Sequence, residues 1–218
     1  MMVLLEPTRK IAEVGGPVVI ILMGVSVLTL SVIFYKLWQF SVAGVGRHRA
    51  LRDAISAWDS NERSEARRAL DSSKSYLAPV VDMALSGRVI STDRLMAEAE
   101  ARFGKLETGL RFLDSVAQLA PLLGLFGTVL GMIEAFQSLQ DAGAQVDPSI
   151  LAGGIWVALL TTAVGLVVAM PTALILSWFE GRMETERVFA EKAIQTVLAP
   201  AGQASQHGSV SQMVPNHA

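Results

Sequence analysis

The sequence predicts an all-α integral membrane protein with three transmembrane helices. Three apolar runs support this prediction, because residues 17–35, 115–133 and 148–179 contain no Asp, Glu, Lys or Arg. A helix needs roughly 20 apolar residues to cross the hydrocarbon core of a bilayer, and each run approaches or exceeds that length. The composition agrees, since 51% of the 218 residues are hydrophobic and only 17% are charged, which is too apolar for an ordinary soluble domain.

The composition also excludes several classes of function. The chain has no cysteine, which rules out disulfide bonds and thiol catalysis. Its net charge of -2 argues against a nucleic-acid partner. His48, His207 and His217 have no neighbours at metal-ligand spacing, and no Ser–His pair, His-rich tract or acidic pair indicates an active site. We therefore predict no cofactor, no metal site and no enzymatic activity.

The first transmembrane helix is assigned to residues 17–38 and follows a terminal segment of residues 1–16. Its apolar run of about 18 residues is longer than the apolar part of a usual signal peptide. No A-x-A cleavage site follows it. We expect this helix to be retained.

The positive residues orient the helices in the membrane. Residues 41–114 contain twelve Lys or Arg, whereas residues 140–149 contain none. Lys and Arg concentrate on the cytoplasmic side of membrane proteins. This distribution places residues 39–114 and the C-terminal region in the cytoplasm, and the N-terminus and residues 140–149 on the outer side.

The cytoplasmic loop, residues 39–114, is predicted to be helical. The stretches RHRALRDAISAW and ERSEARRAL have helical periodicity with alternating charge signs. Ser75 to Leu85 is expected to form a short amphipathic helix that ends at Gly87.

Another helix is expected to lead from this loop into the membrane. From Leu95 onward, apolar residues recur every three or four positions through the second apolar run. This pattern predicts one unbroken helix from about residue 92 to 139, capped by Ser91 or Thr92. Gly104 and Gly109 weaken it locally.

The second transmembrane helix is assigned to residues 115–139, and the turn of residues 140–149 leads to the third, at residues 150–179. Asp147 and Pro148 are suited to the start of a helix. Pro171 removes one backbone hydrogen bond and is expected to bend the third helix.

The third helix is expected to continue as a cytoplasmic helix over residues 180–199, through about Leu198. Trp156 and Trp178 lie 22 positions apart, roughly 33 Å along a helix, and fit the two aromatic belts of a bilayer. Residues 200–218 are polar and are predicted to be disordered.

Small residues form a stripe along each of the last two transmembrane helices. Membrane helices associate through close packing that small residues permit, and two readings remain open: packing within one chain, or a bundle of several subunits. The stripe of the second helix is Gly124, Gly127 and Gly131, and that of the third is Gly154, Ala158, Thr162, Gly165, Ala169 and Ala173.

Three threonines and one acid are the candidates for a proton pathway. Thr128, Thr161 and Thr162 either hydrogen-bond their own helices or form a weakly polar lining beside a group that carries protons. Threonine does not titrate in the physiological range. Glu134 is a possible intramembrane acid, although it is close enough to the outer end of its helix to reach the interface. If protons cross, we expect the essential carboxylate to come from another protein.

Two motifs resemble a known family. APLLGLFGTVLGM (120–132), followed by AGGIWVALLTTAVGLVVAMP (152–171), is similar to the MotA/TolQ/ExbB proton channel family. The three-helix layout is most similar to its ExbB and TolQ branches. The resemblance implies a multi-pass protein of the bacterial inner membrane, with residues 1–16 and 140–149 periplasmic and the C-terminus cytoplasmic.

The resemblance also implies an assembly and a role. Family members form a homopentameric helical ring around two helices of an ExbD- or TolR-type partner. That single-span partner carries a membrane aspartate. Proton flow through this stator energises a TonB- or TolA-type protein that acts on the outer membrane. Thr128 and Thr162 match the pore threonines of the family.

One position departs from the pattern of the family. ExbB and TolQ proteins commonly read G-I-A-E-A-L in the third helix, whereas this chain has Val157 at the place of the glutamate.

Service to TonB-dependent transport is the leading expectation. A Tol-Pal role in the cell envelope and a non-conducting membrane scaffold remain the alternatives.

Overall fold

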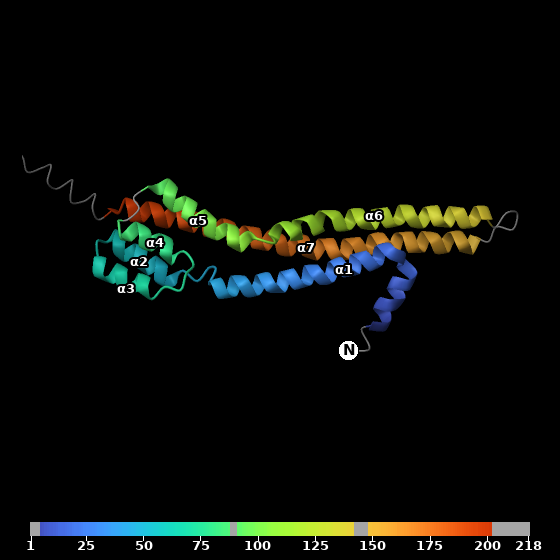
Figure 1. Cartoon of the computed structure of the whole chain (residues 1–218), viewed down its shortest axis with the longest axis horizontal. Coiled ribbons are helices and arrows are strands. Elements are labelled where there is room, and N and C mark those ends of the chain that lie inside the picture. The colour runs from blue at the N-terminus through green and yellow to red at the C-terminus, as the bar shows by residue number, and fades with distance from the viewer. Residues whose placement is uncertain (1–4, 88–90, 142–147, 202–218) are drawn as a thin grey trace, which may run out of the picture. The chain divides into compact units, whose positions relative to one another are not determined.

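The computed structural model describes residues 5–87, 91–141 and 148–201, and in these residues the only regular secondary structure is α-helical. The all-α prediction is confirmed. Three segments are long and apolar enough to cross a membrane: Gly16–Ala43, Leu110–Asp141 and Leu151–Leu198. In chain order the helices are α1 (Leu5–Ala43), α2 (Arg49–Asp59), α3 (Arg63–Asp71), α4 (Ala78–Leu85), α5 (Thr92–Glu107), α6 (Leu110–Asp141) and α7 (Pro148–Leu198) (Figure 1).

The chain divides into two compact units. One, here called the three-helix unit, contains α1 up to Tyr35, then α6, then α7 up to Phe179. The other, here called the small-helix unit, contains the end of α1 from Lys36, the four short helices α2 to α5, and α7 from Glu180.

Within the three-helix unit, α1 bends sharply at Gly16 (Figure 1). Gly16 has φ 67° and ψ -168°, which a residue with a side chain adopts only with strain. Pro17 follows it in the first turn of the apolar helix, where its missing N–H costs no hydrogen bond. The sequence predicted the helix from residue 17 but not the helical segment before the bend.

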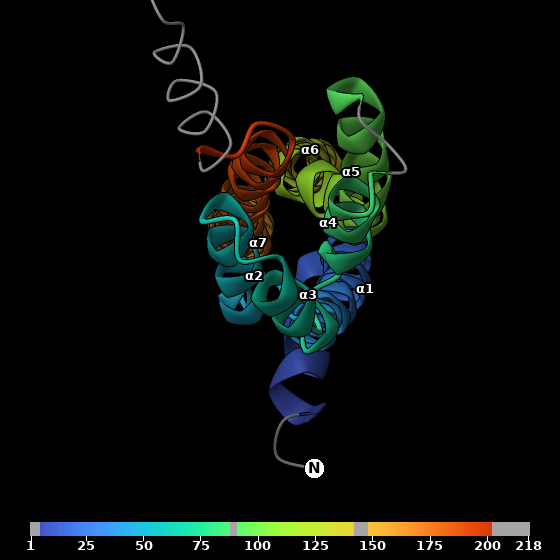
Figure 2. The ribbon, with the colours of Figure 1, turned by 90° about the vertical axis from the view of Figure 1, so that its left-hand side faces the viewer.

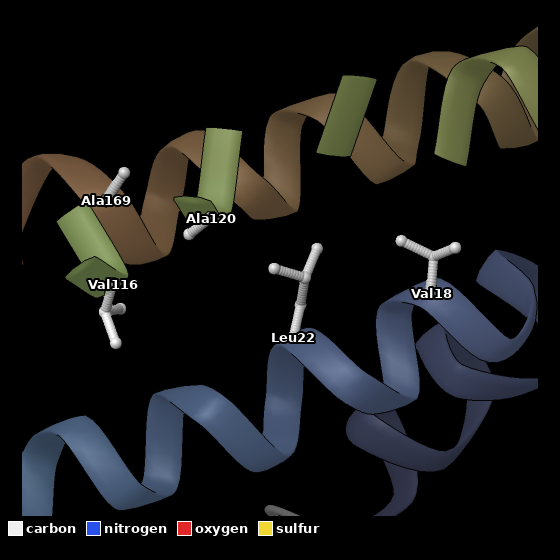
Figure 3. Packing of buried hydrophobic residues seen from close by; sticks show 5 residues of the cluster. All are labelled: Val18, Leu22, Val116, Ala120 and Ala169. Carbon is white, nitrogen blue, oxygen red and sulfur yellow. The ribbon is translucent and has the colours of Figure 1, made fainter. Parts of the chain in front are cut away.

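The three apolar helices share one small core. Val18 and Leu22 of α1 pack with Val116 and Ala120 of α6 and with Ala169 of α7 (Figure 3). Most other apolar side chains of these helices are exposed, and in each helix's most apolar stretch only 22–28% of the residues are buried. Such a surface suits contact with lipid or with other subunits.

The predicted unbroken helix over residues 92–139 is wrong. The structure contains α5 and α6, separated by Thr108 and Gly109. Thr108 has ψ 123°, and Gly109 has φ 92°, in the left-handed region. Leu113 N–H donates to the Gly109 carbonyl, so α6 starts anew at this glycine. The long third helix, by contrast, runs from Pro148 to Leu198 as predicted, while Asp147 lies outside the described residues.

In the small-helix unit, α2 and α3 lie where helical periodicity predicted helices, and α4 starts later than predicted. The predicted helix from Ser75 begins instead at Ala78, because the Ser75 hydroxyl accepts the Leu77 N–H in a turn before the helix. Gly87 has φ 66° just after α4 ends. Ser91 precedes α5 as expected, but its side chain forms no capping hydrogen bond.

The core of this unit is built largely from α2, α4, α5 and the C-terminal part of α7, which are labelled in Figures 1 and 2. Its fully or nearly fully buried side chains include Leu51, Leu77, Val80, Leu95, Ala99, Phe103, Met183 and Ile194.

Candidate functional site

The candidate site is the contact between α6 and α7, where small residues of the two helices face each other. A β-carbon added at Gly127 would lie 2.7 Å from Thr161 Cβ, and one at Gly131 would lie 3.2 Å from Ala158 Cβ. Contact residues with higher numbers in α6 meet residues with lower numbers in α7, so the two helices pack antiparallel. The two stripes pack on each other within one chain, which was the simpler of the two readings of the sequence.

Glycines of α7 complete this contact. A β-carbon at Gly165 would lie 2.6 Å from the Ala120 carbonyl oxygen, and one at Gly154 would overlap the Ala135 side chain. Gly165 also lies against Gly124, since a β-carbon at Gly165 would lie 3.1 Å from Gly124 Cα. Ala158 and Ala169 are buried.

The Gly124 carbonyl is the polar centre of this contact. Its oxygen lies 3.1 Å from Thr161 Oγ1 and 3.2 Å from Thr162 Oγ1. Thr161 Oγ1 is closer to the Ala158 carbonyl of its own helix, at 2.7 Å. A hydroxyl has one proton to donate. The Thr161 hydroxyl is within reach of two carbonyls, those of Gly124 and Ala158. The Thr162 hydroxyl donates to the Gly124 carbonyl.

Thr128 is joined to the same point through its backbone. In an α-helix the carbonyl of residue 124 accepts the N–H of residue 128. The Thr128 hydroxyl instead donates to the Leu125 carbonyl at 2.6 Å, within its own helix. The hydroxyls of Thr161 and Thr162 therefore meet at the Gly124 carbonyl, whereas that of Thr128 does not. Thr161 is buried, and Thr128 and Thr162 keep part of their surface open.

The remaining predicted site residues lie away from this centre. Glu134 is exposed on α6, and its carbonyl accepts the Ser138 hydroxyl. Val157 is half-buried on α7. Pro171 lies inside α7, whose helix continues past it without interruption.

A buried polar cluster in the small-helix unit was missed by sequence reasoning. His48 Nε2 lies 2.5 Å from Glu186 Oε2, and the Tyr76 hydroxyl donates to the same oxygen at 2.7 Å. His48 Nδ1 lies 2.9 Å from Ser75 Oγ. His48 also stacks on the Phe189 ring, with centroids 4.6 Å apart.

The hydrogen bonds of this cluster favour the ionised form of Glu186. Glu186 is 2% exposed, and burial acts to raise its pKa. Hydrogen bonds from His48 and Tyr76, with the nearby Arg182, outweigh burial, and the net pKa of Glu186 is lowered. Burial and then the carboxylate raise the pKa of Tyr76. Ser75 Oγ accepts the Leu77 N–H and also lies within hydrogen-bond distance of His48 Nδ1, while Nε2 of the same ring faces Glu186.

Two long sequence separations explain why the cluster was missed. Ser75 follows His48 by 27 positions, and Glu186 follows it by 138. The one available signal was an acid on the predicted cytoplasmic helix at an otherwise apolar helical spacing, between Met183 and Ala190. In the part of the chain that the structure describes, no three His, Cys, Asp or Glu side chains gather in a way that could hold a metal ion.

Comparison with known proteins identifies the family of this chain. Residues 74–192 match the MotA/TolQ/ExbB proton channel family. The chain is 34% identical over 165 residues to a putative biopolymer transport protein ExbB-like 1 of Synechocystis sp., a match covering 72% of this chain and 64% of that protein. It is 31% identical over 188 residues to the biopolymer transport protein ExbB of Neisseria meningitidis serogroup A, covering 76% and 84%.

The TolQ branch is represented as well. The Tol-Pal system protein TolQ of Pseudomonas aeruginosa is 40% identical over 80 residues, covering 37% of this chain and 34% of TolQ. The chain thus spans less than two thirds of the Synechocystis relative but most of the Neisseria one. With a family match over more than half of its length and the ExbB relative beside it, the chain belongs to the MotA/TolQ/ExbB proton channel family.

Proposed function

We propose that this chain is an inner-membrane stator subunit that uses the proton-motive force, together with a single-span ExbD-type partner, to energise TonB-dependent transport across the outer membrane. The observation that carries the proposal is the α6–α7 contact, with Thr161 and Thr162 at the Gly124 carbonyl, in a chain that belongs to a proton channel family.

The threonines divide the work in this proposal. Thr161 is buried between the helices and sets their spacing. Thr128 and Thr162 keep part of their surface open, so they can meet the helix of a partner and line the proton path. Neither residue titrates at physiological pH. The proton carrier is therefore an aspartate of the partner, and Val157 takes no part in proton transfer.

The exposed apolar surfaces support assembly into a homopentameric ring. Leu122, Phe126 and Val129 are exposed on α6, and Leu159 and Val167 on α7. Three helices are few for a self-contained path across a membrane, and side chains of this kind pack well against neighbouring subunits or lipid. The ring would enclose two membrane helices of the partner.

The charge distribution supports the proposed topology. The small-helix unit, with its many Lys and Arg, lies in the cytoplasm together with the C-terminal part of α7, and the N-terminus and the α6–α7 turn are periplasmic. Glu134, exposed near the outer end of α6, is then available to the periplasmic interface.

The choice of TonB over Tol service rests on extent of similarity. The match to the Neisseria ExbB covers 84% of that protein, whereas the Pseudomonas TolQ match covers 34%. Tol-Pal service in envelope integrity is therefore the second candidate, with a TolR- and TolA-type set of partners.

Native mass spectrometry of the complex, extracted gently from its own membrane, tests the proposal. We expect five copies of this chain with two copies of a small single-span protein bearing a membrane aspartate. A monomer or dimer persisting across several mild detergents would overturn the ring. Deletion of the chain then separates the services, since loss of siderophore uptake indicates TonB service and detergent sensitivity indicates Tol service.

A further inference from the structure

A pocket lined by arginines lies just after the end of α1. It has a volume of about 520 Å³ and belongs wholly to the small-helix unit. It is an open depression on the surface, since Arg47, Arg49 and Arg52 are all exposed. Its lining residues are Gly46, Arg47, Arg49, Ala50, Arg52 and Asp53.

The pocket carries uncompensated positive charge. It contains three arginines and one carboxylate. In the described ranges, no acidic side chain lies within ion-pair distance of Arg47, Arg49 or Arg52. Elsewhere in the same unit, arginines such as Arg67 and Arg102 do pair with acids. The pocket is therefore suited to an anion that the chain itself does not supply.

The pocket consists of the end of the loop before α2 and the first turns of α2, and this loop is fixed by contacts on its buried side. Its central residue, His48, is buried and hydrogen-bonded in the polar cluster, so the arginines on either side of it stay at the surface. Arg182 of α7 donates to the Val45 carbonyl at 3.3 Å and packs so closely on Gly46 that a β-carbon would not fit there.

Chain length keeps the pocket near the membrane. Arg47 follows Ala43, the last residue of α1, by four positions, and four residues span at most about 14 Å. Apolar and aromatic side chains remain exposed almost to the end of α1, with Trp38 65% and Val42 69% exposed. Exposed tryptophan of this kind is typical of the membrane–water interface. Lys36 Nζ donates to the Leu106 carbonyl at 2.9 Å and ties these last turns to the small-helix unit.

We propose that this pocket binds the phosphate of an anionic phospholipid headgroup in the cytoplasmic leaflet. Guanidinium groups bind phosphate through paired, charge-assisted hydrogen bonds, and a basic cluster immediately cytoplasmic of a membrane helix suits anionic lipid. Asp53 repels a free phosphate dianion, but its carboxylate can accept a hydrogen bond from a headgroup hydroxyl. This favours a phosphoglycerol headgroup, as in phosphatidylglycerol.

The proposal goes beyond proton conduction and does not depend on it. It requires that α1 crosses a membrane with the small-helix unit on the cytoplasmic side, as in the proposed topology, but neither the pentamer nor the partner enters the argument. A failed ring in native mass spectrometry leaves the lipid site untouched, and a failed lipid site leaves the stator role untouched.

The test compares two triple variants of the purified full-length chain. Arg47→Gln/Arg49→Gln/Arg52→Gln removes the pocket charge. Arg68→Gln/Arg94→Gln/Lys192→Gln removes three exposed charges elsewhere in the same unit and serves as the matched control. Each is titrated in neutral detergent with phosphatidylglycerol, phosphatidylcholine or inorganic phosphate, and bound lipid is counted by native mass spectrometry.

We expect phosphatidylglycerol binding to weaken about tenfold or more in the pocket variant and to stay near wild type in the control. Equal weakening in both variants, or none in the pocket variant, would overturn the proposal. Phosphatidylcholine that binds as tightly as phosphatidylglycerol, or inorganic phosphate that displaces it at equal concentration, would overturn the lipid headgroup as ligand. Because Arg52 lies 5.9 Å from the Phe189 ring, the double variant Arg47→Gln/Arg49→Gln replaces the triple one if the latter misfolds.

Discussion

Gly165 of α7 faces the Ala120 carbonyl of α6 with no room for a side chain between them. A β-carbon at residue 165 would lie 2.6 Å from that oxygen. Gly165→Ala must therefore push the two backbones apart, and we expect a loss of about 1–3 kcal/mol of stability. Thermal unfolding of the purified chain in a mild detergent measures it.

Gly153→Ala is the matched control for that substitution. Gly153 lies in the same helix, and a β-carbon there would meet nothing within 4 Å. Alanine is the better helix former by about 1 kcal/mol, so this variant should be as stable as wild type or more so. If both variants lose the same stability, close packing at Gly165 is not the cause.

Thr162→Val keeps the shape of the side chain and removes the hydroxyl that donates to Gly124. Hydrogen bonds between membrane helices contribute on average about 0.6 kcal/mol, so the assembly should survive. If Thr162 lines the proton path, proton flux through the complex in liposomes should fall.

Thr172→Val controls for the loss of a threonine hydroxyl in the same helix. Thr172 is buried, and its hydroxyl donates to the Val168 carbonyl, one turn back in the same helix. Proton flux through the complex with Thr172→Val should equal that of wild type. Normal flux in the Thr162 variant, with normal assembly, would favour the scaffold alternative.

Glu186 gives the small-helix unit a predictable response to pH. Its folded-state pKa is lowered from 4.5, so its contribution to stability is complete above about pH 4.5 and disappears as the pH falls through the lower folded value. Glu186→Gln should destabilise the unit by roughly 1–3 kcal/mol at pH 7, since it weakens two hydrogen bonds to a charged group. The difference from wild type should shrink below pH 4.5.

Hydrogen exchange of the α2 peptide, residues 49–59, reports this effect locally. Glu184→Gln is the control, because Glu184 lies two positions away on the same helix and is exposed. A difference between Glu186→Gln and wild type that is constant from pH 3 to pH 7 would contradict the assigned carboxylate.

The break between α5 and α6 is tested by a pair of glycines. Gly109 has φ 92°, and a residue with a side chain is strained there by about 1–2 kcal/mol. Gly109→Ala should therefore destabilise the chain. Gly104→Ala, inside α5 and with nothing within 4 Å of the added carbon, should be neutral or stabilising. Thermal unfolding measures the stability of both variants. If both were more stable than wild type, one continuous helix would be favoured over the break.

Local pattern predicted much of this fold. Runs without charge located the three apolar helices, and periodicity located α2 and α3, because these signals depend on residues within a few turns of one another. The spacing of small residues marked the contact face of α6 and α7. It did not reveal which chain supplies the opposite face, since packing within and between chains requires the same residues.

The misses share a physical cause. Gly109 was recognised as a weak point, but a glycine costs a helix only about 1 kcal/mol, and contacts distant in sequence decide whether the helix continues or breaks. The His48–Glu186 pair joins residues 138 positions apart. A single histidine gives no local sign of such a partner.

The glycine contact between α6 and α7 also limits how the gene can vary. Glycine is the smallest residue, so every amino-acid change at Gly124, Gly127 or Gly165 adds atoms where the added carbon would already be too close. Neighbouring outward positions such as Leu125 and Phe126, which are exposed, accept changes in both directions as far as this hairpin is concerned. In a library covering all substitutions, positions at which no substitution is tolerated should recur along α6 every three to four residues. Selection at these codons can only retain glycine.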